Sequence, residues 1–272
     1  MFGLIGRIIN IEQQQKVFHH HSVELYQTDI LQSDGIFSFP FIDLIVTSPP
    51  YNVGINYSSN NDELSYADYV HFSRQWMEKC FVLSRPQARF CLNIPLDKNK
   101  GGHQSVGADL TNIAKNIGWQ YKTTIIWNEG NISKRTAWGS WKSASAPCVI
   151  APVELIVVFY KDQWKKTSGT KESDIAKDEF MAYTNGLWTF NGESKKRIGH
   201  PAPFPKELPY RCIKLFSYIG DIVFDPFAGS GTTLIVAEKL KRKGVGTEID
   251  VDYFNLAKKR IKKELGSLLS VL

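Results

Sequence analysis

The chain is poor in cysteine and lacks long hydrophobic runs. Its four cysteines, at positions 80, 91, 148 and 212, show no close pairing and have no histidine at zinc-ligand spacing. This pattern predicts reduced thiols, a cytoplasmic location and no metal site. The apolar start Met1–Ile11 lacks a cleavage pattern, so we expect no secretory signal, and no segment approaches a membrane span. We expect His19, His20 and His21 to form a solvated linker.

What the chain does have is enough apolar sequence for one large core. It has 272 residues, of which 43% are apolar, and this length predicts an α/β core with a modest extra lobe. The formal net charge of +6 favours a polyanionic partner, although many proteins share so mild an excess.

Short β-rich runs alternate with amphipathic stretches along most of the chain. Strands are expected at 23–27, 42–47, 89–94, 122–127, 154–160, 221–224 and 245–249. Helices are expected at 66–84, 107–116, 206–218, 232–241 and 253–265. Interleaved elements of this kind predict a doubly wound, mostly parallel, seven-stranded α/β sheet.

The run Thr47-Ser48-Pro49-Pro50-Tyr51 closes one of these apolar strands. Consecutive prolines have fixed φ and carry no N–H, and a residue before proline is extended, so Ser48 and the Pro49 carbonyl can project beyond the strand end as acceptors. Two acceptors against an aromatic amine would aim its lone pair at an electrophilic methyl group. Tyr51 would stack on the aromatic base that carries this amine. Taken alone, the motif is equally consistent with an ordinary turn.

A second motif follows the strand near residue 221. Asp225-Pro226-Phe227-Ala228-Gly229-Ser230-Gly231-Thr232-Thr233 predicts a glycine turn leading into a helix, whose N-terminus can receive an anion such as a methionine carboxylate. The next strand ends at Glu248-Ile249, and Glu248 lies 23 positions after Asp225, about where nucleotide-binding units place a ribose-binding carboxylate. No Gly-Lys-Ser/Thr follows the turn, which excludes a P-loop.

Together the two motifs resemble the DNA methyltransferases that modify cytosine N4 or adenine N6 with S-adenosylmethionine. The resemblance covers about 23–265, and the catalytic motif precedes the cofactor motif, as in the β class of that family. It implies a Rossmann-like methyltransferase fold in which Ser48, Pro49, Pro50 and Tyr51 are catalytic. It also implies cofactor contacts from 225–233 and Glu248-Ile249. Protein glutamine methyltransferases use a similar motif in the reverse order, which favours nucleic acid as substrate.

Two further segments are similar to cofactor-binding positions of the β class. One is His200-Pro201-Ala202-Pro203-Phe204-Pro205, from which we assign His200, Pro201, Phe204 and Pro205 to the cofactor. The other is Asp29, for which capping of a short helix is an equally good explanation. The basic run 258–263 lies largely off the apolar stripe of the last helix, which favours a solvated face, with phosphate contact as the alternative.

Residues 128–197 break the alternating pattern and hold four of the seven tryptophans. The resemblance places the target-recognition insert here. It predicts a tail at 1–21, a catalytic half at 22–128, the insert at 129–197, a cofactor half at 198–265 and a tail at 266–272. Polar and aromatic side chains suggest DNA contacts, with packing onto the core as the alternative. These residues are Arg135, Trp138, Trp141, Lys142, Lys195, Lys196 and Arg197.

The sequence therefore predicts a site-specific methyltransferase that acts on a base flipped out of double-stranded DNA. Serine at position 48 favours cytosine N4, and adenine N6 is the alternative. A catalytically silent DNA-binding specificity subunit is a third hypothesis. A cognate restriction endonuclease and a homodimer are possible partners, and no membrane association is expected.

Overall fold

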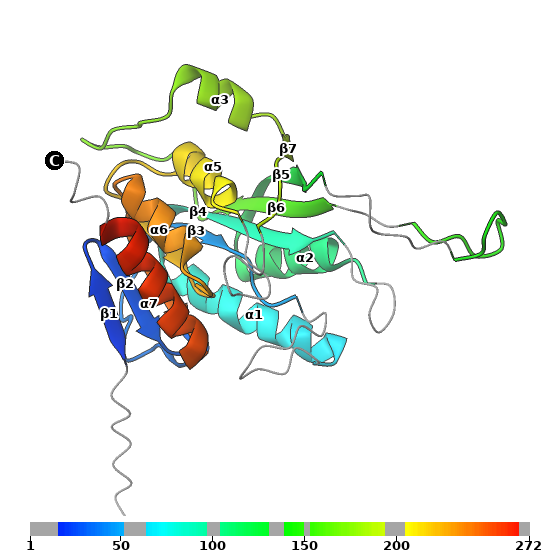
Figure 1. The fold of residues 1–272 in the computed structure, drawn as a ribbon, viewed down its shortest axis with the longest axis horizontal. Coiled ribbons are helices and arrows are strands. Elements are labelled where there is room, and N and C mark those ends of the chain that lie inside the picture. The colour runs from blue at the N-terminus through cyan, green and yellow to red at the C-terminus, as the bar shows by residue number, and fades with distance from the viewer. Residues whose placement is uncertain are drawn as a thin grey trace, which may run out of the picture.

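Nine strands form one sheet through the centre of the molecule in the computed structural model (Figure 1). The structure describes residues 16–51, 64–96, 104–130, 139–149, 153–193 and 205–266. The strand order is β1-β2-β9-β8-β3-β4-β6-β5-β7. The bounds are β1 (Val17–His20), β2 (Val23–Gln27), β3 (Ile42–Thr47), β4 (Ser84–Pro95), β5 (Gln120–Asn128), β6 (Val153–Tyr160), β7 (Leu187–Thr189), β8 (Ile222–Asp225) and β9 (Lys243–Glu248).

Most neighbouring strands run parallel. Strands β2, β9, β8, β3 and β4 form a continuous parallel block, whereas β1 is antiparallel to β2, and β6 is antiparallel to both β4 and β5. The carboxyl ends of the five parallel strands therefore meet at one edge of the sheet, which is where ligands bind in open α/β folds.

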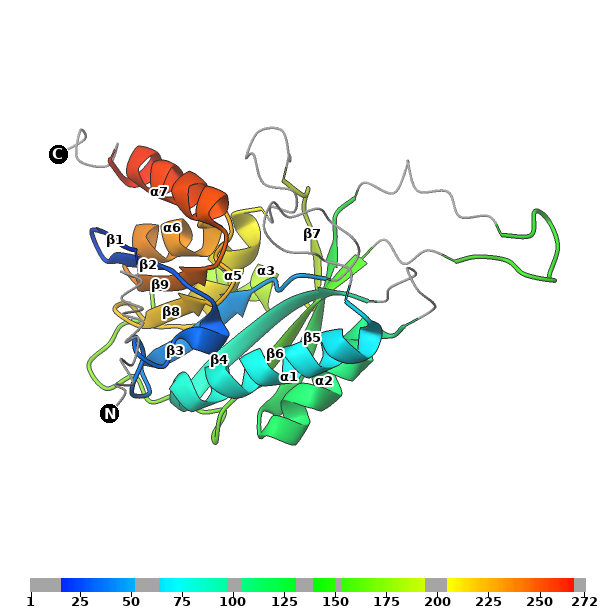
Figure 2. The ribbon, with the colours of Figure 1, turned by 90° about the horizontal axis from the view of Figure 1, so that it is seen from below.

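Helices cover both faces of the sheet and make a three-layer molecule (Figure 2). Helices α1 (Tyr66–Leu83) and α2 (Val106–Ile117) pack on one face, and α5 (Glu207–Phe216), α6 (Thr232–Lys239) and α7 (Val251–Gly266) pack on the other. A short helix α3 (Lys177–Tyr183) lies outside α5, and a 3-10 turn η1 (Ile30–Gln32) follows β2. No helix in the described ranges combines the length and apolar character needed to cross a bilayer.

Burial explains why the central strands are continuously apolar. All six residues of β3 are buried because helices cover both sides of that strand, so its sequence shows no alternation. Helix α7 instead faces the core along a single stripe of Phe254, Ala257, Ile261 and Leu265, as its spacing predicted.

The predicted doubly wound, mostly parallel α/β sheet is confirmed, and each of the seven expected strands is present with small changes at its ends. Two strands were not predicted, namely β1 and β7. The expectation of a linker at 19–21 is wrong for His19 and His20, which pair with Glu24 and Val23 across the β1–β2 hairpin. The division of the chain into catalytic half, recognition insert and cofactor half stays a prediction.

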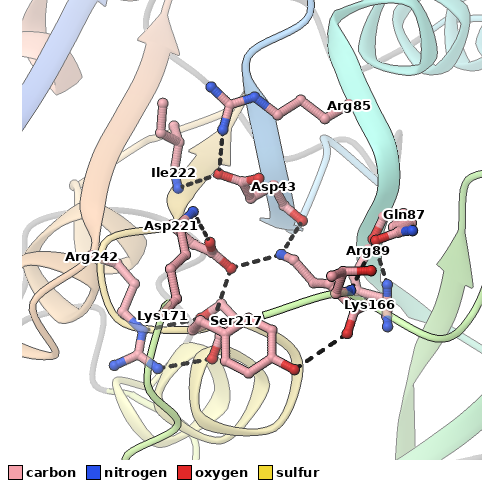
Figure 3. A network of polar contacts seen from close by, with 12 residues as sticks. Asp43, Arg85, Gln87, Arg89, Lys166, Lys171, Ser217, Asp221, Ile222 and Arg242 are labelled. Atoms are coloured by element: carbon pink, nitrogen blue, oxygen red, sulfur yellow. Dashed lines mark hydrogen bonds and ion pairs between the residues drawn. The ribbon is translucent and has the colours of Figure 1, made fainter. Parts of the chain in front are cut away.

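A polar network ties the segment after β6 to the edge of the sheet where β3 and β8 begin (Figure 3). The fully buried Asp221 accepts hydrogen bonds from Lys166 and Lys171, both at 2.6 Å. Asp43 accepts from Arg85 and from the backbone N–H of Ile222, each at 2.9 Å. Because this network lies at the amino ends of the parallel strands, it leaves the opposite edge free for a ligand.

Candidate functional site

The proline motif and the glycine motif follow neighbouring strands at the carboxyl edge of the sheet. Strand β3 pairs in parallel with β8, so Ser48 and Pro226 leave adjacent strand ends. The Thr47 hydroxyl donates a 2.7 Å hydrogen bond to the Asp225 carboxylate, across 178 positions of sequence. The two motifs therefore converge at adjoining strand ends.

The turn from β8 into α6 needs its glycines. Gly229 and Gly231 have φ of 51° and 78°, in the left-handed region that favours glycine. A Cβ on Gly231 would also lie 3.2 Å from the Ala257 side chain of α7. Larger residues here would strain the backbone and push α7 away from the turn.

Two buried carboxylates hold this turn. The Glu248 side chain accepts from the backbone N–H of Gly229 at 2.7 Å and of Asp250 at 2.9 Å. Burial raises the pKa of Glu248 to about 7 and that of Asp225 to about 6, because each anion has lost most of its water. Each oxygen of Glu248 retains a further lone pair that can accept from a hydroxyl group of a ligand.

Arg260 braces the same turn from α7. Its Nη1 donates to the Ser230 carbonyl and to the Ser230 hydroxyl, both at 2.6 Å, and to the Thr232 hydroxyl at 3.1 Å. The expectation of a solvated helix face is therefore wrong for Arg260, which turns inward, while Lys259 on the same helix is exposed.

Two residues of the proline motif form a polar cluster with one residue of β4 and one of β6. The Ser48 Oγ lies 2.6 Å from the Tyr51 Oη, and Asn93 Nδ2 donates to Tyr51 Oη at 2.9 Å. Glu154 Oε2 lies 3.0 Å from Tyr51 Oη and 2.6 Å from Asn93 Nδ2. The parallel register of Thr47 with Leu92 sets Ser48 beside Asn93, and the antiparallel β4–β6 register brings Glu154 to the same place.

Tyr51 is half-buried and points its hydroxyl group into this cluster while its ring packs against the core beneath α1. Burial and the Glu154 carboxylate raise the pKa of Tyr51 well above its ordinary value, so the phenol keeps its proton at neutral pH. Stacking of Tyr51 on a base stays a prediction.

Several other predicted cofactor residues lie at this edge with structural contacts of their own. Phe227 packs edge-on against Trp76 at a centroid distance of 5.2 Å. Thr233 is buried against β3, and Ile249 is 46% exposed beyond the end of β9. Asp29 follows β2 and caps η1 by accepting from the Leu31 N–H at 2.9 Å, so the capping explanation is confirmed and its cofactor contact stays a prediction.

Some predicted residues lie outside the described residues. They are His200, Pro201 and Phe204 of the second cofactor segment, and Arg135, Trp138, Lys195, Lys196 and Arg197 of the proposed DNA surface. Pro205 is described and buried just before α5. Trp141 and Lys142 lie on the segment 139–149, which projects far from the sheet in both views (Figures 1 and 2). The Trp141 side chain is 65% exposed, with the Lys142 ammonium 5.7 Å from its ring centroid.

Sequence reasoning missed Asn93, Glu154 and Arg260. Asn93 was visible as a polar residue within an apolar strand, a pattern that marks a buried polar contact. Nothing local predicted Glu154 or Arg260 as site residues, because their partners are more than 25 positions away and depend on strand order and helix packing.

Comparison with known proteins agrees with this geometry. A family model described as DNA methylase matches residues 42–259, from the first residue of β3 into α7. The chain belongs to the DNA methylase family. The match spans both strand-end motifs and the segment between them.

Individual relatives support the same assignment. The Type II methyltransferase M.MjaVI of Methanocaldococcus jannaschii is 62% identical over 157 residues, which cover 58% of this chain and 80% of the relative. The protein TTHA0409 of Thermus thermophilus, solved with S-adenosyl-L-methionine, has a TM-score of 0.70 at 27% identity, with 88% of this chain and 93% of that chain covered.

A second similar structure is the cytosine-N4-specific PvuII DNA methyltransferase. It has a TM-score of 0.65 and covers 91% of this chain and 93% of its own, but at 21% identity it shows a shared fold only. This member of the family is an S-adenosylmethionine-dependent DNA methyltransferase.

The residues of the glycine turn fit that cofactor. The free lone pairs of Glu248 can accept from the two ribose hydroxyls, and the glycines permit the backbone to approach a ligand closely. S-adenosylmethionine supplies the electrophilic methyl group of the reaction.

Proposed function

We propose that this enzyme methylates N4 of cytosine in duplex DNA and that Ser48 is the residue that receives the target amine. The single observation that carries the proposal is the Thr47–Asp225 hydrogen bond. It holds the residue before Ser48 against Asp225, the first residue of the glycine motif. Ser48 Oγ and the Pro49 carbonyl accept from the amine, Pro50 stiffens the turn, and Tyr51 forms one wall of the base site.

The amine must leave the duplex to reach this position. Ser48 directly follows the end of β3, which is flanked by β8 and β4. A base that remains stacked in a duplex cannot align its amine with a methyl donor held at this strand end. Base flipping into a protein pocket is the general solution to this problem.

The choice of cytosine rests on the uncharged hydroxyl at position 48. Adenine N6 is the second candidate, because both bases present the same kind of amine to the same acceptors. In this proposal the family resemblance, in which serine favours cytosine, decides between them.

We propose that the projecting segment 139–149 contacts DNA through Trp141 and Lys142. An exposed tryptophan beside a lysine can stack on a base and approach a phosphate, and their placement far from the core makes packing a poor explanation for both. Contacts from Arg135, Trp138, Lys195, Lys196 and Arg197 are part of the same proposal.

The proposal extends to cellular context by likeness alone. Because M.MjaVI is named a Type II methyltransferase, we propose a partner endonuclease for the same DNA site and action on cytoplasmic DNA. A homodimer stays a prediction.

Mass spectrometry of nucleosides from DNA methylated by the purified enzyme tests the proposed target. We expect N4-methylcytosine from the wild type and none from Ser48→Ala, in which one amine acceptor is lost. N6-methyladenine as the sole product would replace cytosine with adenine, and no methylated nucleoside with any duplex substrate would favour the silent-subunit hypothesis.

A further inference from the structure

A chain of hydrogen bonds leads from the catalytic serine to a carboxylate on a strand that sequence reasoning left out of the site. It runs from Ser48 Oγ to Tyr51 Oη at 2.6 Å and from Tyr51 Oη to Glu154 Oε2 at 3.0 Å. Asn93 Nδ2 bridges the last two groups, at 2.9 Å from the phenol oxygen and 2.6 Å from the carboxylate. Each distance lies within hydrogen-bonding range.

The polarity of this chain follows from a count of protons. The Tyr51 phenol has one proton to donate. The Glu154 carboxylate oxygen, at 3.0 Å, is a closer and stronger acceptor for it than the backbone carbonyl of Asn93 at 3.4 Å. Asn93 directs its amide hydrogens towards both groups, because its oxygen would repel the carboxylate. The phenol therefore gives its proton to Glu154, and the Ser48 hydroxyl must donate to Tyr51.

This polarity leaves the lone pairs of Ser48 available. Apart from a marginal approach of Asn93 Nδ2 at 3.5 Å, no donor in the described residues engages the serine oxygen. One atom of the Asn93 side chain also lacks a partner in the described part of the chain. Asn93 is 1% exposed, and its Oδ1 accepts no hydrogen bond from the described residues. A ligand amine would complete both groups.

We propose that Glu154 is a positioning residue that acts through Tyr51 to make Ser48 a proton acceptor and that receives the proton released by the reaction. The inference rests on methyl transfer to an exocyclic amine and holds for either base. It gives the Tyr51 hydroxyl a role apart from any stacking by its ring.

Protons and charges balance along this path. The new N–C bond uses the amine lone pair, and the broken S–C bond leaves its electrons on sulfur, so the nitrogen holds one surplus proton. That proton moves to Ser48 Oγ as the serine proton moves to Tyr51 Oη and the phenol proton moves to Glu154. The sulfonium charge and the Glu154 carboxylate charge disappear together, so the transfer creates no new charge on the sulfur, the base or Glu154.

Position supports Glu154 as the end of the path. It is the second residue of β6 and is only half-buried, so a proton that it receives can pass to solvent once the product leaves. Asp225, the other nearby buried carboxylate, is engaged with Thr47 and with the Phe227 N–H instead.

Single-turnover methyl transfer by Glu154→Gln and Tyr51→Phe tests the proposal. We expect the transfer rate constant to fall about 100-fold in each variant, which is the lower range for a lost proton-transfer group. The dissociation constants of cofactor and DNA should change little, because neither variant removes a binding contact. The double variant should lose no more than either single one, since both break the same path.

A readout in the ligand-free protein separates the hydrogen-bond chain from activity. The ¹³Cζ resonance of Tyr51, assigned by its loss in Tyr51→Phe, should shift in Glu154→Gln. Tyr121→Phe is the matched control, because among the described residues its hydroxyl contacts only the Thr124 hydroxyl, at 3.0 Å, on the same sheet. It should keep wild-type rates.

The outcomes distinguish the two levels of the account. An inactive wild type would remove the proposed function itself. An active wild type with unchanged transfer rates in Glu154→Gln and Tyr51→Phe would overturn the proposed proton path from Ser48 to Glu154. Independent, additive losses in the double variant would overturn it too.

Discussion

In the mechanism that we propose, Ser48 is a weak proton acceptor that depends on its neighbours. A serine hydroxyl does not ionise near neutral pH, but an amine that has just gained a methyl group is acidic and needs only an acceptor aimed at it. The cluster of Tyr51, Asn93 and Glu154 fixes where the serine proton points. In the mechanism that we propose, the cluster orients the serine hydroxyl and the Glu154 carboxylate receives the released proton.

We expect Glu248 to make cofactor binding dependent on pH. Burial raises its pKa to about 7 in the ligand-free protein, so the carboxylate is mostly ionised above that pH and mostly protonated below it. A protonated carboxyl group accepts hydrogen bonds from the ribose hydroxyls more weakly than the carboxylate does. We expect S-adenosylmethionine to bind about tenfold more weakly at about pH 6 than at about pH 8, measured by calorimetry.

Glu248→Gln is the control for this dependence. It should bind the cofactor weakly at every pH in that range, with a much flatter profile, because the titrating group is gone. An equally steep profile in the variant would assign the pH dependence to another group, of which Asp225, with a pKa raised to about 6, is the nearest.

At the scale of elements, the site depends on the contact between β3 and β8. Their parallel pairing sets two loops side by side, and the buried Thr47–Asp225 hydrogen bond joins them at the strand ends. Arg260 adds a brace from α7, so residues from three separate parts of the chain fix the cofactor turn.

Thr47→Val tests this contact, since valine keeps the shape but leaves Asp225 without that donor. Hydrogen bonds to charged groups contribute about 1.5–3 kcal/mol, so the free energy of unfolding should fall by about 2 kcal/mol in a denaturant titration. Cofactor binding should weaken as well, because the turn after Asp225 loses its attachment to β3.

Two further variants complete that test. Thr47→Ser keeps the hydroxyl and should retain cofactor binding. Thr124→Val removes a threonine hydroxyl from β5, where its partner Tyr121 is 46% exposed, and should change stability by no more than about 0.5 kcal/mol. Equal effects of Thr47→Val and Thr124→Val would contradict a special role for the β3–β8 contact.

Most of the strands, but not all of the site, could be predicted from the sequence. The apolar runs and strand-end motifs are local patterns, so seven strands and both motifs were predictable. Strands β1 and β7 have only four and three residues, too few for a periodicity to stand out. Glu154 joins the site because β6 inserts antiparallel between β4 and β5, a long-range arrangement that no local pattern encodes.

At the scale of the whole molecule, the carboxyl ends and the amino ends of the parallel strands carry different groups of polar residues. The carboxyl edge holds the two strand-end motifs and the buried Asn93, whose Oδ1 has no partner among the described residues, whereas the Asp221 network lies at the amino edge. That network attaches the segment around Lys166 to β8, far from the reacting groups. We therefore expect the Asp221 network to contribute to stability and not to methyl transfer.

Asp221→Asn should therefore lower stability and leave chemistry intact. Burial alone would raise the pKa of Asp221, but Lys166 and Lys171 outweigh it and hold the pKa below its ordinary value. The stabilisation is present above the unfolded pKa and is lost as pH falls through the folded pKa. Removing one partner of a buried ion pair costs about 3–5 kcal/mol, which thermal or denaturant unfolding would detect.

Asp178→Asn, an exposed aspartate of α3, is the matched control and should change stability by no more than about 0.5 kcal/mol. The folded fraction of Asp221→Asn should transfer methyl groups at the wild-type single-turnover rate. A rate that falls with stability intact would place this network in the catalytic machinery and contradict the separation of the two edges.

A crystal structure of the enzyme with duplex DNA and an unreactive S-adenosylmethionine analogue tests the central claim most directly. We predict the analogue against Gly229, Gly231 and Glu248, and a flipped base whose amine lies within hydrogen-bonding distance of Ser48 Oγ and in line with the group that replaces the methyl. A base amine held by other residues, or an analogue bound away from the glycine turn, would contradict the account.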